Sequence, residues 1–155
     1  MERTLIIVKP DALQRNLLGK IITRFEDKGL KLVALKMAGM TDEKITEHYG
    51  HHADKPFFPG LKSFMQSAPV VMMILEGVEA IEAVRLITGE TKGRAADAGT
   101  IRGDFAMSVQ ANIIHASDSV ESASAEIQRF FTPEEIFAYQ QHNAEWVYSP
   151  DERDA

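Results

Sequence analysis

The most informative stretch of this chain reads Asn112-Ile113-Ile114-His115-Ala116-Ser117-Asp118-Ser119. Two β-branched residues precede the histidine and predict that it lies at the end of a buried strand. A polar turn and then an amphipathic helix follow, so the histidine is expected near the free N–H groups of a helix start, which suit an anion. Such a histidine is well placed to act as a nucleophile or general base. A packed, structural histidine is the alternative interpretation, and this stretch alone leaves it open.

Apolar patterns on either side of this stretch predict alternating strands and helices. Further strands are expected over Thr4–Val8, Leu30–Met37 and Pro69–Leu75, the last apolar on both faces and therefore central. Helices are expected from Leu18 to a stop at Gly29, over 42–49 behind a Thr41 cap, over 61–66 after a rigid turn at 55–60, over 79–87, and after Thr132-Pro133-Glu134-Glu135. The helix after His115 is expected to bury Val120, Ala123, Ile127, Phe130 and Phe131. This order predicts an α+β fold, a ferredoxin-like split βαβ sandwich in which helices pack on the faces of a four-stranded antiparallel sheet.

Composition narrows the class of protein. The 155 residues suffice for one domain with a real core, and 45% hydrophobic with 26% charged residues is an ordinary globular balance. A formal charge of −6 disfavours binding of nucleic acid by bulk electrostatics. The absence of cysteine excludes disulfides, thiolate metal sites and cysteine nucleophiles. Leu5–Val8 is too short for a signal segment and Val70–Leu75 too short to span a bilayer, so we expect a soluble, cytoplasmic protein without membrane contact.

A long segment between Thr88 and Gln110 has no periodicity and is rich in Gly, Thr, Arg and Asp. Loops of this length inside compact domains are usually functional. Its glycines allow close approach of a ligand, and the guanidinium of Arg102 matches phosphate oxygens. The alternative is a solvated loop in which Arg102 pairs with Asp104. Because the chain has neither a Walker-type loop nor a Gly-x-Gly-x-x-Gly turn, side chains must make most contacts with any phosphate.

Two further side chains suit chemistry at His115. Glu126 follows in the next helix, and a carboxylate bonded to one imidazole nitrogen would leave the other nitrogen free to attack. Ser117 would in turn hold that carboxylate, although a solvated helix glutamate is the simpler interpretation.

Lys9, at the end of the first strand, suits either a ligand-facing cation or a lysine that reaches to solvent.

A cluster of His48, His51 and His52 at a helix end raises the question of a metal site. The chain has no cysteine and its nearby acidic residues are scattered, so a dedicated protein-held metal is disfavoured.

Taken together, the motifs of this chain resemble those of nucleoside diphosphate kinases. They are Thr4-Leu5-Ile6-Ile7-Val8-Lys9-Pro10-Asp11, Lys55-Pro56-Phe57-Phe58, Gly89-Glu90-Thr91, Gly99-Thr100-Ile101-Arg102-Gly103-Asp104-Phe105 and the His115 stretch. They occur in the family's order from about Arg3 to Tyr148, nearly the whole chain, which is far more specific than any single motif. The resemblance implies a kinase domain over 1–148, followed by a mobile acidic tail over 149–155.

The resemblance also implies an activity and a set of site residues. The γ-phosphoryl group of a nucleoside triphosphate such as ATP would pass to a nucleoside diphosphate by a ping-pong mechanism, through a phosphohistidine at His115, with broad base specificity. Mg²⁺ would be held by the nucleotide phosphates and not by the protein, and the chain would form a homo-oligomer, a hexamer favoured over a tetramer. The implied roles are sugar contacts for Lys9 and Asn112, base stacking for Phe57, phosphate contacts for Arg85, Thr91, Arg102 and His52, proximity to His115 for Tyr49, and orientation of the imidazole for Glu126 and Ser117.

The chain departs from the family pattern at several positions. Ala116 stands where the family usually has glycine, which places a Cβ beside the nucleophile. Lys92-Gly93-Arg94 replaces the usual Asn-Pro-Ala, and Ala98 stands where a proline is often found. In the family this loop lies at oligomer interfaces, so these changes are expected to loosen it and to bear on the subunit count.

Two other classes of protein share features with this sequence. RNA-recognition domains share the split βαβ arrangement, and Arg102-Gly103-Asp104-Phe105-Ala106 faintly resembles their aromatic motif. The aspartate at a stacking position and the negative charge count against that class. A catalytically silent relative would be favoured by loss of His115 or Arg102, and both are present.

Overall fold

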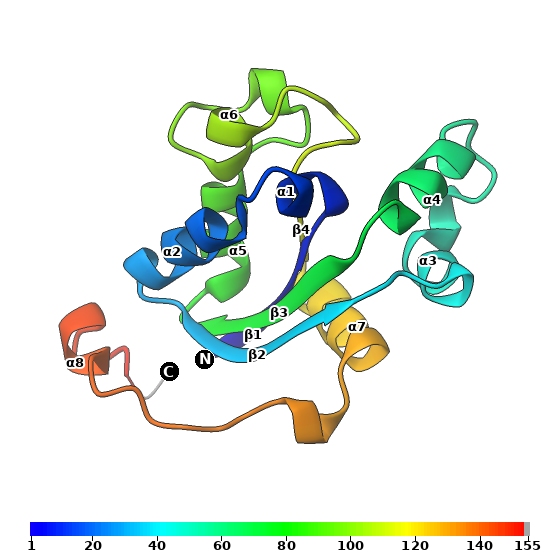
Figure 1. Ribbon diagram of the computed structural model, residues 1–155. Helices are drawn as coiled ribbons and strands as arrows, with labels where there is room; N and C mark the ends of the chain where they lie inside the picture. The colour runs from blue at the N-terminus through cyan, green and yellow to red at the C-terminus, as the bar shows by residue number, and fades with distance from the viewer. Residues whose placement is uncertain (154–155) are drawn as a thin grey trace.

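A computed structural model describes residues 1–153 of the chain. Its four strands form one antiparallel sheet in the order β2-β3-β1-β4 (Figure 1). The strands are β1 (Glu2–Val8), β2 (Lys31–Ala38), β3 (Val70–Gly77) and β4 (Ile114–Ala116). The two central strands pair from Glu2 opposite Gly77 to Val8 opposite Val71. The predicted α+β class and four-stranded antiparallel sheet are confirmed.

Helices pack on both faces of this sheet because successive side chains of a strand point to opposite faces. Ile6 and Val8 of β1 enter one core, which α2 (Leu18–Lys28) and α5 (Ala80–Thr88) cover. Leu5 and Ile7 enter the second core. The helices of this second layer are α3 (Asp42–Tyr49), α4 (Phe58–Gln66) and α7 (Val120–Phe130), as Figure 1 shows. The remaining short elements are α1 (Pro10–Gln14), η1 (Gly50–His52), η2 (Gly93–Ala95), α6 (Ile101–Phe105), η3 (Pro133–Glu135) and α8 (Ala144–Val147).

Two predicted helix ends are confirmed by their backbone geometry. Gly29 ends α2 in the left-handed region with φ of 93°, a conformation that glycine adopts without steric cost. Thr41 begins α3, and its hydroxyl accepts a hydrogen bond from the backbone N–H of Lys44.

Other predictions differ from the structure. The turn expected over 55–60 is wrong from Phe58 onward, because α4 already begins there and Pro59 fits its first turn, where no N–H is needed. Val120 does not join the buried stripe of α7 and is 59% exposed. Thr132 does form a capping box with Glu135, but only the 3₁₀ turn η3 follows. The backbone then runs along β2, where the N–H of Phe137 donates to the carbonyl of Val33.

The C-terminal part of the chain is only partly within the described residues. Ser149 donates local hydrogen bonds to the carboxylates of Asp151 and Glu152, and Arg153 donates to the carbonyl of Tyr148. Residues 154 and 155 of the predicted tail lie outside the described residues, and its mobility stays a prediction. Across residues 1–153, no helix combines the length and the apolar character needed to cross a bilayer.

Candidate active site

The predicted site residues converge on one pocket of about 800 Å³ at the end of the sheet where β1 and β4 meet. All of them except Ser117 line this pocket, and Ser117 lies directly behind Glu126. The lining residues among them are Lys9, Tyr49, His52, Phe57, Arg85, Thr91, Arg102, Asn112, His115 and Glu126. Ala116, the departure beside the nucleophile, also lines the pocket.

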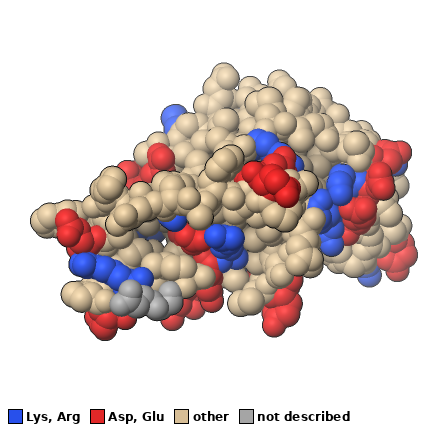
Figure 2. Space-filling model, turned by 90° about the horizontal axis from the view of Figure 1, so that it is seen from below, with Lys and Arg blue, Asp and Glu red and all other residues tan. Residues whose placement is uncertain are grey.

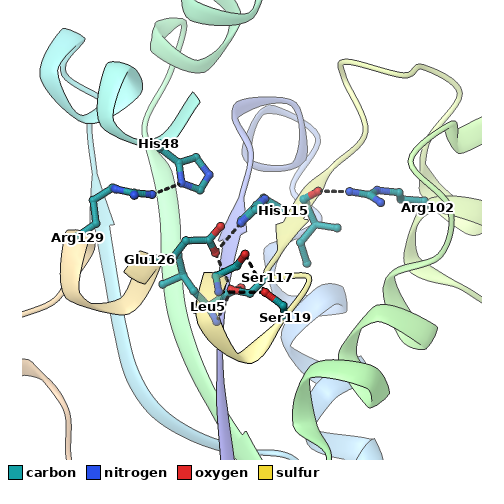
Figure 3. Close-up of polar contacts among 10 residues, drawn as sticks. Leu5, His48, Arg102, His115, Ser117, Ser119, Glu126 and Arg129 are labelled. Carbon is teal, nitrogen blue, oxygen red and sulfur yellow. Dashed lines mark hydrogen bonds and ion pairs between the residues drawn. The ribbon is translucent and has the colours of Figure 1, made fainter. Parts of the chain in front are cut away.

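A chain of hydrogen bonds orients the imidazole of His115 (Figure 3). Its Nε2 lies 2.9 Å from Oε2 of Glu126, and the Ser117 hydroxyl donates to the same oxygen at 2.6 Å. The hydroxyl also accepts from the backbone N–H of Leu5, at 3.2 Å, which ties the chain to central strand β1. Burial raises the pKa of Glu126, but the bonds from His115 and Ser117 outweigh it and the net shift is downward. The carboxylate is therefore ionised and accepts, so the His115 proton lies on Nε2.

The backbone just before the histidine is strained. Ile113 has φ of 76°, a left-handed conformation that a β-branched residue rarely adopts and that costs of order 1–3 kcal/mol. Two contacts hold it: the Ile113 N–H donates to Oδ2 of Asp11 at 3.1 Å, and its carbonyl accepts from the N–H of Lys9 at 2.9 Å. The turn that delivers His115 to the pocket is thereby attached to the end of β1 and the start of α1.

Cationic side chains line the same pocket as His115. The ammonium of Lys9 donates to Oδ1 of Asn112 at 2.6 Å, and Nδ2 of Asn112 donates to the carbonyl of Thr91 at 2.9 Å. Burial, together with the charge of Arg102, lowers the pKa of Lys9 to about 8, although Asp11 opposes the shift. The Lys9 ammonium is thus placed where a polar ligand would restore part of its lost solvation.

Arg102 does not form the solvated ion pair with Asp104 that was the alternative interpretation of this loop. Its guanidinium donates to three backbone carbonyls, at 3.0 Å to Gly89, 3.3 Å to Asn112 and 2.7 Å to Ile114. Asp104 instead pairs with Arg24 at 2.9 Å. Burial lowers the pKa of Arg102 to about 10, and the neighbouring charge of Arg85 adds to this shift. Arg102 therefore joins the 88–110 segment to the His115 strand and also presents positive charge to the pocket.

The pocket rim and its floor offer different kinds of contact. At the rim, Phe57 is 50% exposed and its ring centroid lies 5.3 Å from that of His52. On the floor, the hydroxyls of Tyr49 and Thr88 are buried and have no hydrogen-bond partner among residues 1–153. Buried polar atoms without partners are uncommon, so a ligand group that reached either hydroxyl would supply its missing partner.

The structure does not bring the imidazoles of His48, His51 and His52 together as one candidate metal site, but groups His48 with His115 and Glu126. The rings of His51 and His52 contact each other, with centroids 3.9 Å apart and planes tilted by 46°, whereas His48 approaches His115 and Glu126. The candidate ligand atoms of these last three residues lie within 4.8 Å of one another. Those of His115 and Glu126 already bond each other, so the group is organised by hydrogen bonds.

Two residues of the site were missed from the sequence. Arg129 lies behind the pocket residue His48, with its Nη1 3.1 Å from Nδ1 of that ring, and it gave no signal because a charged residue in the last turn of a helix is ordinary. Asp11 was noticed only as part of the Lys9-Pro10-Asp11 motif, and its bond to Ile113 joins residues 102 apart in the chain. A motif showed that Asp11 mattered, but only the tertiary structure shows what it binds.

Comparisons with known proteins agree on one family. The profile of a family described as nucleoside diphosphate kinase matches residues 2–136. A nucleoside diphosphate kinase of Parabacteroides distasonis is 53% identical, over 98% of this chain and 99% of that protein. Nucleoside diphosphate kinase B of Mus musculus is 49% identical, over 96% of this chain and 97% of that protein. Among solved structures, a halophilic nucleoside diphosphate kinase from Halobacterium salinarum in complex with CDP has a TM-score of 0.93 and 44% identity, over 96% and 99% of the two chains.

Proposed function

Because this chain belongs to the nucleoside diphosphate kinase family, we propose that His115 carries the phosphoryl group between two nucleotides that occupy its pocket in turn. The family reaction moves the γ-phosphoryl group of a nucleoside triphosphate to a nucleoside diphosphate. One observation carries the assignment to His115. Its Nε2 is bonded to Glu126 at 2.9 Å, while no described residue hydrogen-bonds Nδ1, in a pocket that cations also line. An imidazole held at one nitrogen and free at the other is an oriented nucleophile.

In the first half-reaction, the lone pair of Nδ1 attacks the γ-phosphorus. The bond between that phosphorus and the bridging oxygen breaks, and the nucleoside diphosphate leaves with the electron pair. Positive charge develops on the ring as the P–N bond forms, and the ionised Glu126 balances it through the Nε2 proton. In the second half-reaction, a terminal phosphate oxygen of the acceptor attacks the phosphorus, the P–N bond breaks, and neutral His115 returns.

The remaining site residues are proposed to hold the nucleotide. A buried ammonium bonded to an amide suits ribose hydroxyls, an exposed ring suits stacking on any base because every base has a π-face, and guanidinium groups suit phosphate oxygens. Tyr49 brings a buried, unpartnered hydroxyl to the same pocket. We assign sugar contacts to Lys9 and Asn112, stacking to Phe57, and phosphate contacts to Arg85, Thr91, Arg102 and His52.

Mg²⁺ is proposed to enter with the nucleotide. Among residues 1–153, the carboxylates that line the pocket are Asp118 and Glu126, and Glu126 is engaged with His115 and Ser117. One remaining carboxylate does not make a protein cage for Mg²⁺, but it fits an ion coordinated mainly by phosphate oxygens and water. Bound in this way, Mg²⁺ would neutralise phosphate charge and help to align the transferred group.

The partners of the chain follow from its surfaces and substrates. On edge strand β2, Leu35 and Met37 are 50% and 63% exposed, which supports a homo-oligomer that covers them, and we retain the hexamer as the favoured state over a tetramer. Figure 2 shows Lys and Arg interspersed with Asp and Glu on one face, a pattern that disfavours nucleic acid as a partner. We expect the protein to act in the cytoplasm, where nucleotides and Mg²⁺ occur together. Light scattering of the purified protein determines the subunit number.

The proposed intermediate is tested with γ-labelled ATP and no acceptor. We expect label on the protein that is stable in alkali and lost in acid, as a phosphoramidate requires, and no label on His115→Ala. Varying donor and acceptor concentrations is expected to give parallel double-reciprocal plots. Intersecting plots, or full labelling of the alanine variant, contradict the assignment.

A further inference from the structure

His48 lies in the last turn of α3, and its ring is buried beside the His115 imidazole. Only 6% of the residue is exposed. Its ring meets that of His115 edge to face, with centroids 4.6 Å apart and planes at 88°. The rings of Tyr49 and Phe130 pack against His48 in the same manner, at 4.4 and 5.3 Å. The His48 ring is therefore held in place by packing next to His115, and the proposed mechanism gives it no role.

Arg129 fixes the proton of this ring. Nη1 of Arg129 lies 3.1 Å from Nδ1 of His48 (Figure 3). A guanidinium group offers only donors, so Nδ1 of His48 must accept, and the proton of the neutral ring lies on Nε2. Burial is the main cause that lowers the pKa of His48 to about 3, so the ring is neutral at pH 7. The Lys44 ammonium donates to the Arg129 carbonyl at 2.8 Å and thereby ties the end of α7 to α3.

The reaction needs such a neighbour for two reasons. A single hydrogen bond at Nε2 leaves the His115 imidazole able to rock about that contact, which would move Nδ1 away from the phosphorus. A misplacement of 1 Å is enough to cost about 10²-fold in rate. In addition, a charged ring beside His115 would oppose the positive charge that develops as the P–N bond forms. A packed, neutral His48 meets both needs.

We propose that Arg129 and His48 are positioning residues: Arg129 orients the His48 ring, and this ring restricts rotation of the His115 imidazole so that its free nitrogen faces the nucleotide. The proposal rests on the proposed role of His115 as phosphoryl carrier. It adds an edge-to-face ring contact, held by α3 and α7, to the hydrogen bond by which Glu126 and Ser117 orient the imidazole.

A metal site at the same three residues is the competing interpretation, since the ligand atoms of His48, His115 and Glu126 lie within 4.8 Å of one another. The Arg129 contact disfavours it. To bind a metal through Nε2, His48 would have to move its proton to Nδ1, where it would face the guanidinium donors. The contact that orients the ring thus also makes it a poor ligand.

A double-mutant cycle tests whether Arg129 acts through His48. The variants are Arg129→Met, His48→Phe and their combination, with Gln128→Met, an exposed residue of the same helix, as the matched control. Rapid-quench measurement of His115 phosphorylation at saturating Mg-ATP gives the rate, and binding of Mg-ADP gives the affinity. We expect each single substitution to slow phosphorylation about 10-fold. Affinity stays within about 2-fold, and the double variant is no slower than the slower single variant.

Nitrogen-15 NMR of the imidazole groups supplies a readout that packing alone would not change. At pH 7, wild-type His48 is expected to show protonated Nε2 and unprotonated Nδ1, and Arg129→Met is expected to show a mixture of tautomers. This measurement tests the proposal even where His48→Phe fails to fold, because it requires only the substitution of Arg129, which is partly exposed.

The outcomes separate the two proposals. Independent effects of the two substitutions in the cycle, or an unchanged His48 tautomer in Arg129→Met, overturn the positioning role. Wild-type labelling at His115 together with an Arg129→Met rate equal to that of Gln128→Met also overturns it, and leaves the phosphohistidine intact. Absence of label on the wild type overturns the proposed function itself.

Discussion

Lys9 is a buried cation whose cost to stability depends on pH in a way that the structure defines. Its pKa is lowered from the ordinary value of 10.5 to about 8, chiefly by burial. Between these two pH values the unfolded chain still holds a proton that the folded protein has released. The free energy of unfolding therefore rises as pH increases through this interval. The whole pKa shift of Lys9 changes the free energy of unfolding by about 3 kcal/mol, and about 2 kcal/mol of this change occurs between pH 7.5 and pH 10.

Lys9→Met removes this dependence. Methionine keeps most of the side-chain volume but neither titrates nor donates to Oδ1 of Asn112, so that buried oxygen loses its 2.6 Å partner. The lost bond lowers stability by about 1–3 kcal/mol at every pH. We therefore expect the stability of wild type relative to Lys9→Met to be about 2 kcal/mol greater at pH 10 than at pH 7.5.

The assay is urea denaturation at pH 7.5 and pH 10, at one protein concentration because association shifts apparent stability. Lys20→Met, which replaces an exposed lysine of α2, is the matched control and should follow wild type. If wild type and Lys9→Met change in parallel between the two pH values, the Lys9 ammonium does not titrate in this interval and the reasoning fails.

Two further substitutions test the site directly. Glu126→Gln keeps the shape of the side chain but removes the charge that balances the phosphorylated ring, so single-turnover phosphorylation should slow about 10²-fold while the affinity for Mg-ADP stays unchanged; a full rate in the glutamine variant would show that this charge is not needed. Phe57→Ala removes the exposed ring at the rim and should weaken binding of ADP, GDP and CDP by a similar factor, about 1–3 kcal/mol each in calorimetry. A loss confined to one base would argue against stacking.

Local patterns in the chain predicted the elements because their causes are local. The apolar run of β3 marked a central strand, Gly29 marked the end of α2, and Thr41 marked the start of α3, and each involves residues within a few positions of one another. The helix expected after Thr132 is the exception. Its capping box formed, yet the next residues run along β2, and a partner about 100 residues away in the chain outweighed the local preference.

The site residues could likewise be predicted in part from the sequence, whereas several of their contacts could not. His115, Glu126 and Lys9 were recognisable because their chemistry and spacing match one family's motifs, and the comparisons confirm that family. No pattern indicated that Arg102 bonds three carbonyls, or that Arg129 bonds His48 across 81 residues of chain. The sequence itself determines the residue types and the local preference for helix or strand. A hydrogen bond between distant side chains, such as that between His48 and Arg129, forms only once α3 and α7 have packed on the sheet.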